Sequence, residues 1–250
     1  MATRLIKTQE KLQRIKIALG LALGLNLLFW GMSSGIYARW EGVPPVPTRR
    51  GAIMLTLGDA EFAYRSLALA LQNLGDVGRD VTPLKDYDYR RLGQWFYLLH
   101  SLDPLSDHVP FIAAYYFGST KVPKDSAVVV DYLRTAGVVP GGEKWRWLAE
   151  AAYLAQHRMY NLQLALEIAY QLAKLPDNSD LPQWARQMPA FVLKNRGDKE
   201  AARQMMENML VTDKNAHPQE ISFMKLFLIE DLGVDPQEVD RMMRMRAEGH

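Results

Sequence analysis

The residue types that most often carry chemistry are few in this sequence, and their spacing is not that of a catalytic or metal site. The five histidines are scattered, with no HExxH pair and no second ligand at helical spacing: His100, His108, His157, His217 and His250. The sequence has no cysteine, which excludes a thiol nucleophile and a thiolate metal site. It also lacks a Walker phosphate-binding loop and a dinucleotide-binding glycine motif. We therefore expect no enzymatic activity, no cofactor, no bound metal and no small-molecule substrate.

One pair of carboxylates lies close together, in the sequence Asp86-Tyr87-Asp88 at the predicted start of a helix. Carboxylates near a helix N-terminus are stabilised by the helix dipole and by backbone N–H groups. We therefore interpret this pair as capping residues rather than metal ligands.

Aromatic side chains are concentrated between residues 95 and 170, and they are better candidates for binding than for catalysis. Thin layers of helices need large side chains between them, so most of these aromatics should be core. The aromatics concerned are Trp95, Phe96, Tyr97, Phe111, Tyr115, Tyr116, Phe117, Trp145, Trp147, Tyr153, Tyr160 and Tyr170. Neighbouring residues in a helix diverge by about 100°. One of Tyr115 and Tyr116 should therefore face away from the core, where a ligand or partner can reach it.

The first element of the chain that could position a binding surface of this kind is an apolar run over residues 17–38. This run contains no charged side chain. At about 1.5 Å per residue this run forms a helix of roughly 33 Å, enough to cross a hydrocarbon core of about 30 Å. Residues 1–16 before it are basic and suit anionic lipid headgroups. We predict a basic N-terminal segment at 1–16 followed by one transmembrane helix at 17–38.

A cleaved signal peptide is the alternative, because it also combines a basic start with an apolar stretch. The run is longer than a usual signal-peptide core, and Ile36 is not the small residue expected before cleavage at Ala38. Cleavage after Gly35 remains the competing interpretation. Five basic residues precede the run and three follow it closely, so the positive-inside rule predicts a cytoplasmic N-terminus. Residues 39–250 would then be non-cytoplasmic, and periplasmic in a bacterium.

The composition of the remaining chain is that of a folded protein, with 48% apolar and 23% charged residues. The net charge of +2 and the absence of basic runs beyond the leader argue against a nucleic-acid partner. Residues 39–57 contain Pro44, Pro45 and Pro47, which oppose helix and favour an extended spacer. The apolar sequence at its end, residues 52–57, fits either a short strand or a segment packed on the first helix pair.

From residue 58 to residue 250 the sequence alternates helical runs with short loops marked by Gly, Pro, Asp and Asn. The predicted helix pairs are 59–74 with 86–102, 108–119 with 124–136, 143–157 with 161–175, 182–196 with 198–211, and 218–232 with 236–247. Corresponding positions near the start of each second helix are 37, 38, 36 and 37 residues apart: Arg90, Ala127, Ala165, Ala201 and Glu238. A constant period predicts stacked hairpins. The expected fold is therefore all-α, an α-solenoid of about five helix hairpins.

Two segments of this array, residues 148–176 and 183–210, carry features of a known repeat family. These features are the turn Arg196-Gly197-Asp198, the small residues Ala165, Ala201 and Ala202, and the closing Pro176. On these residues the chain resembles the tetratricopeptide-repeat (TPR) superfamily. The Trp, Leu, Gly and Tyr consensus of the first helix is absent from both segments. The resemblance covers about 150 residues and implies a TPR-like array with a groove that binds other proteins.

The geometry of that family implies which first-helix residues face the groove. The implied partner-binding residues are Tyr116, Trp147, Arg158, Arg186 and Lys194, with Glu150 and His157 on the same surface. Cationic side chains can hold a peptide carboxylate through charge-assisted hydrogen bonds, and aromatic rings add apolar contact area. The alternative is that the arginines form a solvated face and the aromatics pack between repeats.

An anchor, a spacer and a helical array are all that a membrane-anchored scaffold or adaptor requires, and this is the function we expect. The predicted partners are other proteins of a membrane-associated complex and, through residues 17–38, the lipid bilayer. The alternative is an accessory subunit permanently packed against an integral-membrane complex. Exposed apolar patches on the array and a packing face at Gly20 and Gly24 would favour that alternative.

Overall fold

The protein is described here by a computed structural model that covers residues 2–33, 42–77, 80–176, 181–213 and 216–248. It divides into two units, which are considered separately. The first comprises Met1–Glu41 and Gly75–Val81, and the second comprises Gly42–Leu74 and Thr82–His250. Twelve α-helices are present among the described residues, and the expected all-α class is confirmed.

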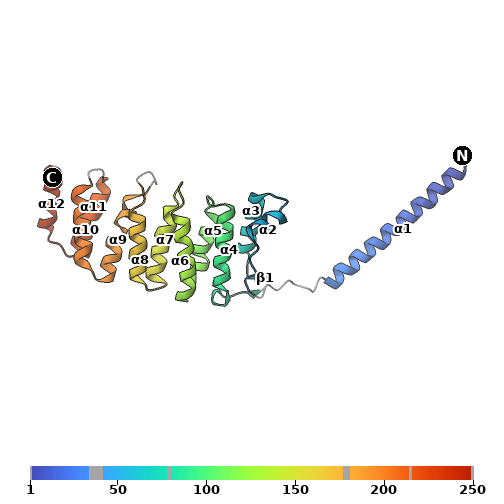
Figure 1. Cartoon of the computed structure of the whole chain (residues 1–250), viewed down its shortest axis with the longest axis horizontal. Coiled ribbons are helices and arrows are strands. Elements are labelled where there is room, and N and C mark those ends of the chain that lie inside the picture. Colours follow the sequence, from blue (N-terminus) through green and yellow to red (C-terminus); the bar gives the residue numbers. More distant parts are fainter. Residues whose placement is uncertain (1, 34–41, 78–79, 177–180, 214–215, 249–250) are drawn as a thin grey trace. The chain divides into compact units, whose positions relative to one another are not determined.

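The first unit contains helix α1 (Ala2–Ser33), which runs without interruption through the basic segment and into the apolar run (Figure 1). The stretch Gln13–Ser33 has a mean hydropathy of 1.7 and is long and apolar enough to cross a membrane. The rest of the predicted span, residues 34–38, lies outside the described residues. A signal sequence near the N-terminus also meets this criterion of length and apolar composition, so both interpretations of this helix still stand. The unit also holds a short antiparallel pair, β1 (Asp76–Val77) and β2 (Asp80–Val81).

The second unit is a series of helices that lie side by side in chain order (Figure 1). Its α-helices are α2 (Arg49–Leu55), α3 (Ala60–Gln72), α4 (Tyr89–Leu102), α5 (His108–Tyr115), α6 (Pro123–Gly137), α7 (Trp145–His157), α8 (Leu162–Ala173), α9 (Gln183–Arg196), α10 (Lys199–Thr212), α11 (Pro218–Leu226) and α12 (Pro236–Glu248). Short 3₁₀ turns η1 (Leu84–Asp86) and η2 (Phe117–Ser119) and a π-helical segment η4 (Phe227–Asp231) complete it. The five predicted helix pairs correspond to α3–α12 and are confirmed.

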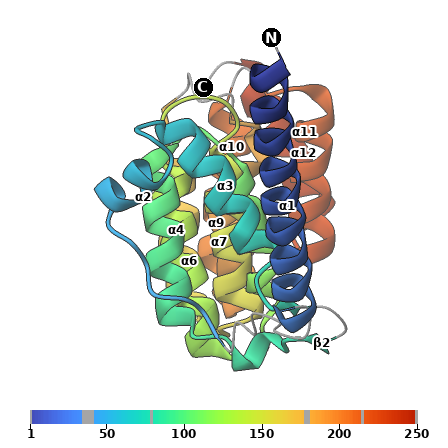
Figure 2. The same ribbon diagram turned by 90° about the vertical axis from the view of Figure 1, so that its right-hand side faces the viewer.

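Helix α2 was not expected, because it forms within the stretch that was interpreted as an extended spacer. Its N-cap is Thr48, whose hydroxyl accepts a hydrogen bond from the Gly51 N–H at 3.1 Å. The helix packs on α3 and α4, beside which Figure 2 shows it. Of the two possibilities for residues 52–57, the structure therefore has the segment packed on the first helix pair.

Local signals explain most of the helix boundaries. Asp88 caps α4 by accepting a hydrogen bond from the Arg91 N–H at 3.1 Å, which confirms the capping interpretation of this carboxylate. Asn161 caps α8 in the same way. At the end of α9, Gly197 has a φ of 94°, a left-handed conformation that glycine adopts without steric cost.

Two hydrophobic clusters form the core of this unit. The larger one runs from α3 to α10 and contains the buried rings of Phe96, Phe117 and Tyr132. The smaller one joins α9 and α10 to α11, η4 and α12. Fewer aromatics are buried than the sequence suggested, since seven of the twelve named above are exposed: Tyr97, Phe111, Tyr115, Tyr116, Tyr153, Tyr160 and Tyr170. The expectation that most of them are core is therefore wrong.

Candidate partner-binding site

Three of the residues implied to face a groove make contacts inside the array instead. Trp147 is only 3% exposed, and its indole Nε1 donates a hydrogen bond to Asp107 Oδ1 at 2.7 Å. Arg186 donates to the backbone carbonyls of Ala173 at 3.1 Å and Leu175 at 3.4 Å, at the C-terminal end of α8. Lys194 forms an ion pair with Asp231 and lies over the Phe227 ring. These contacts are those of packing between hairpins, the alternative raised by the sequence.

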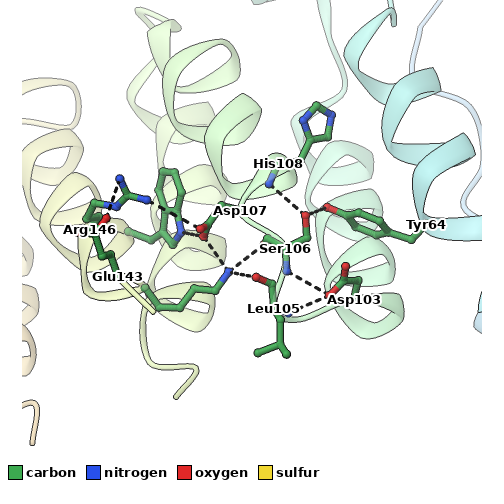
Figure 3. A network of polar contacts seen from close by, with 10 residues as sticks. Tyr64, Asp103, Leu105, Ser106, Asp107, His108, Glu143 and Arg146 are labelled. Atoms are coloured by element: carbon green, nitrogen blue, oxygen red, sulfur yellow. Dashed lines mark hydrogen bonds and ion pairs between the residues drawn. The ribbon is translucent and has the colours of Figure 1, made fainter. Parts of the chain in front are cut away.

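The contacts of Trp147 belong to a polar network that ties the α4–α5 connection to the start of α7 (Figure 3). The Lys144 ammonium, 4% exposed as a residue, donates to Asp107 Oδ1 at 2.7 Å and to the carbonyls of Leu105 at 2.7 Å and Ser106 at 3.0 Å. An ammonium has three N–H donors, so all of them are used. This lysine is therefore a structural cation that holds the α4–α5 connection to the start of α7.

Asp107 is the carboxylate at the centre of this network. Burial alone would raise its pKa, but hydrogen bonds from Lys144 and Trp147, together with the charges of Lys144 and Arg146, outweigh that effect. The pKa of Asp107 is therefore lowered, and the carboxylate is ionised at neutral pH. A carboxylate held in this way stabilises the α4–α5 connection, and its charge is already compensated by side chains of the array.

A different surface is open to a partner, namely a hollow of about 340 Å³ between the end of α5 and the second half of α7. We call it the α5–α7 groove. Its lining residues are Ala114, Tyr115, Gly118 and Ser119 from the α5–η2 side and Glu150, Tyr153, Leu154 and Arg158 from the α7 side. Gly118 allows the two sides to approach closely, because a Cβ there would lie 3.0 Å from Leu154 Cδ1.

The groove presents two aromatic rings to solvent. Tyr115 is 54% exposed and Tyr153 is 49% exposed. The exposed Phe111 extends this surface along α5, since its ring centroid lies 5.0 Å from that of Tyr115. Tyr116 is exposed as well, so the expectation that the two adjacent tyrosines do not both face the core is confirmed, and both of them leave it. Helix α5 ends at Tyr115, and the chain turns there into the η2 segment, which changes the direction of the second side chain.

Two opposite charges complete the groove, and neither has a hydrogen-bonding or ionic side-chain partner within the described part of the chain. Glu150 is half-buried, and burial raises the pKa of its carboxyl. Arg158, at the C-terminal end of α7, is also half-buried. The pKa of Tyr115 is raised by burial and further by the charge of Glu150, an effect that Arg146 opposes. A carboxylate that has lost hydration without gaining a partner favours a cationic group supplied from outside.

The chemistry of this arrangement suits recognition. No group of three or more potential metal ligands occurs in the described ranges. A second hollow of about 410 Å³ lies between α4 and α6, but its carboxylate Asp131 already accepts a hydrogen bond from Tyr97 at 2.6 Å. The α5–α7 groove is the stronger candidate because both of its charged side chains lack partners among the described residues, whereas in the second hollow only the exposed Arg90 does.

Sequence reasoning found part of this groove and missed part. Arg158 and Glu150, which the family geometry implied to face a concave surface, line this groove. Tyr115 was named only as one of two adjacent tyrosines, and Tyr153 only among the aromatics expected to be mostly core. One signal for them was present, since Phe111 and Tyr115 are four residues apart and share a helix face. That Tyr116, Trp147, Arg158, Arg186 and Lys194 bind a partner stays a prediction.

Comparisons with family models, with curated proteins and with solved structures find no match to this chain. The helical array is therefore described by its own geometry, and the resemblance to the TPR superfamily belongs to the proposal that follows.

Proposed function

We propose that this protein is a membrane-anchored scaffold whose TPR-like helical array binds another protein in the α5–α7 groove. The observation that carries the proposal is the combination, in one hollow, of exposed aromatic rings with a half-buried carboxylate and a guanidinium that lack partners among the described residues. Aromatic and arginine side chains in a partly desolvated pocket are the residue types that dominate protein–protein affinity.

The charges define the partner segment more closely. Glu150 would receive a lysine, an arginine or an N-terminal amine, because such a cation restores the interactions that its carboxylate lost on burial. Arg158 would hold a carboxylate or backbone carbonyl of the same segment. Tyr115 and Tyr153 would cover the apolar part of the peptide. Binding should strengthen as the pH rises through the raised pKa of Glu150, where the carboxyl becomes charged.

Helix α1 would act as the tether of this scaffold. Its apolar stretch Gln13–Ser33 and the basic residues before it support a single span with a cytoplasmic N-terminus. The array would then work on the non-cytoplasmic side. A fusion after His250 to a reporter active only outside the cytoplasm tests this orientation, and activity of a cytoplasm-only reporter in the same place would reverse it.

The binding site is tested by purifying the full chain in mild detergent and identifying the proteins recovered with it. We expect Glu150→Gln and Tyr153→Ala to reduce recovery of the partner about 10-fold or more, as is usual for central interface residues. Tyr170→Ala is the matched control, since it removes an exposed tyrosine from α8, outside the groove. Equal thermal unfolding of all variants shows that the fold is intact. Unchanged recovery of every co-purifying protein with the groove variants would reject the site.

The same purification separates the scaffold from the accessory-subunit alternative. A recruited partner held partly by charge should be lost at high salt. A permanent subunit should remain in a fixed stoichiometry through salt and detergent, and that result would favour the alternative.

A further inference from the structure

A cluster of large apolar side chains is exposed where α2 turns into α3. Met54 and Leu55 end α2, Leu57 lies in the turn, and Phe62 is in the first turn of α3. All four are exposed, and Leu57 is exposed completely. We call these residues the α2–α3 apolar tip. An apolar cluster of this kind on a well-formed turn requires an explanation outside the packing of the array.

The backbone of the turn strengthens this argument. Leu57 has a φ of 57°, a left-handed conformation that is uncommon for a bulky residue and that glycine or asparagine adopts more readily. The turn is nevertheless well fixed, with the Gly58 N–H donating to the Ile53 carbonyl at 2.9 Å and Thr56 Oγ1 donating to the Asp59 carbonyl at 2.7 Å. A leucine is therefore held in an unfavourable backbone conformation at a position where its side chain packs against nothing in the described chain.

The tip is borne by an element that is firmly docked on the array. Ala52 of α2 is buried, and Arg49 Nε donates a hydrogen bond to the Ser101 carbonyl at the end of α4, at 3.2 Å. The exposed side chains are therefore presented from a fixed base, which lowers the entropic cost of inserting them into another medium.

We propose that the α2–α3 apolar tip inserts into the boundary between headgroups and acyl chains of the membrane that holds α1. This inference rests on the membrane anchor of the proposed function. Only 15 residues, 34–48, separate the end of α1 from the start of α2. The second part of this stretch is docked on α4, since Val43 is buried and the carbonyls of Val43 and Pro44 accept hydrogen bonds from Arg91 and Trp95, both at 3.0 Å. Residues 34–42 alone therefore join α1 to the docked chain, and they span at most about 30 Å. The unit that carries the tip is therefore held near the bilayer surface at a high effective concentration.

The charges near the tip indicate whether its membrane binding depends on anionic lipid or on insertion of apolar side chains. The carboxylate of Asp59 caps α3, and Glu61 is paired with Arg65 at 2.5 Å. These acidic groups offset most of the positive charge of Arg49, Arg50 and Arg65. The tip should therefore bind through its apolar side chains and depend little on anionic lipid. A turn that presents four apolar side chains is also small for a stable protein interface, which argues for lipid over a second copy of the chain.

Because the sequence has no cysteine, single labels can be placed without other changes. Leu57→Cys carries an environment-sensitive dye in the full chain, reconstituted into phosphatidylcholine vesicles with and without phosphatidylglycerol. Nitroxide-labelled lipids in the same vesicles quench dyes that contact the bilayer. Leu25→Cys in α1 reports insertion of the anchor, and Lys199→Cys, exposed on α10, serves as the negative control.

We expect quenching at Leu57 by shallow nitroxides and at Leu25 by deep ones, with none at Lys199 and little effect of the anionic lipid. Quenching at Leu25 without quenching at Leu57 would overturn this inference and leave the anchor standing. Quenching at neither position would overturn the anchor and this inference together. A dye at Leu57 that becomes shielded with rising protein concentration, without being quenched by lipid, would assign the tip to a second copy of the chain and overturn the inference.

A substitution tests the tip without a cysteine at its apex. With the dye moved to Met54→Cys, the additional change Leu57→Gly should reduce quenching several-fold, because the most exposed apolar side chain is lost. Tyr160→Gly is the matched control, since Tyr160 is also exposed and has a φ of 55° in a turn after α7. Equal quenching with Leu57→Gly and with Tyr160→Gly would contradict the proposed role of Leu57.

Discussion

At the scale of single residues, the polar groups of this protein are of two kinds. Engaged groups have hydrogen-bonding or ionic partners within the chain, and open groups lack such partners among the described residues. Lys144 is an engaged group, since its ammonium holds two backbone carbonyls and the Asp107 carboxylate inside the array. Glu150 is an open one, since burial raises its pKa and no described side chain compensates it. Counting charges along the sequence does not distinguish the two, because the difference lies in their surroundings.

Lys144→Met should lower the free energy of unfolding by about 2 to 4 kcal/mol, because two carbonyls and a carboxylate lose their donor together. Chemical unfolding of the full chain in mild detergent, followed by circular dichroism, measures this loss. Lys121→Met is the control, since that lysine is exposed, and it should change stability by less than about 0.5 kcal/mol. Equal effects of the two substitutions would show that the network contributes nothing to stability.

The lowered pKa of Asp107 predicts a specific loss of stability in acid. A carboxyl whose pKa is lower in the folded state adds stability above its ordinary value of 3.8, where folded and unfolded chains are both ionised. As the pH falls from that value through the lowered pKa, the unfolded chain takes up the proton first and the contribution disappears. Asp107→Asn should therefore flatten the stability profile in this window. Asp240→Asn, which removes one half of an exposed ion pair, should leave the profile unchanged.

Two exposed residues have a left-handed backbone conformation, and at both positions we expect substitution by glycine to stabilise the fold. Leu57 and Tyr160 have φ values of 57° and 55°, and both side chains are exposed. Replacing either with glycine should raise the free energy of unfolding by about 0.5 to 1 kcal/mol, because the steric strain is relieved and little packing is lost. Thermal unfolding of the two single variants checks this. A lowered midpoint for Leu57→Gly would show that the leucine packs within the array after all.

At the scale of helices, the array depends on close approaches at a few small residues. Gly137 ends α6 where the helix meets α7, and a Cβ there would lie 2.6 Å from the Leu148 backbone nitrogen. Gly93 makes a similar approach between α4 and α6, but a Cβ there would meet a side-chain atom, Val128 Cγ1, at 2.7 Å. A backbone atom cannot move away without shifting its helix, whereas a side chain can change its rotamer.

Gly137→Ala should therefore destabilise the protein by about 1 to 3 kcal/mol, and Gly93→Ala should cost distinctly less. The two variants make the same chemical change in similar settings, so each serves as the control for the other. Urea unfolding midpoints give the comparison. If Gly93→Ala proved the more damaging of the two, the α6–α7 contact would not have the rigidity assigned to it.

At the scale of the whole molecule, the two hydrophobic clusters indicate that the array is built from units that stabilise their neighbours. Helix α10 buries Met206 and Leu210 against the C-terminal helices, and Arg246 donates a hydrogen bond to the Leu210 carbonyl at 2.6 Å. The larger cluster, from α3 to α10, does not include α11 or α12. Loss of the C-terminal hairpin should therefore damage the array locally.

Removing residues 213–250 should leave the helices before α11 formed and make the chain aggregate. The physical reason is that Met206 and Leu210 become exposed when their cover is lost. Circular dichroism and size-exclusion chromatography in mild detergent measure helix content and association. Adding Met206→Gln and Leu210→Gln to the truncated chain should restore a single species. Broad loss of helix upstream of residue 213 would contradict this picture of independent neighbours.

The sequence by itself determined the helix pairs, the repeat period and the capping role of Asp88, because these features follow from local periodicity and from side chains that bond to the nearby backbone. Only the tertiary structure decided that α2 forms and docks, and that Tyr115 and Tyr116 both leave the core. It also decided that Trp147 and Arg186 contact their own array. The exposed fraction of a side chain depends on which residues of other hairpins, distant in sequence, pack against it. A local sequence pattern does not specify those contacts.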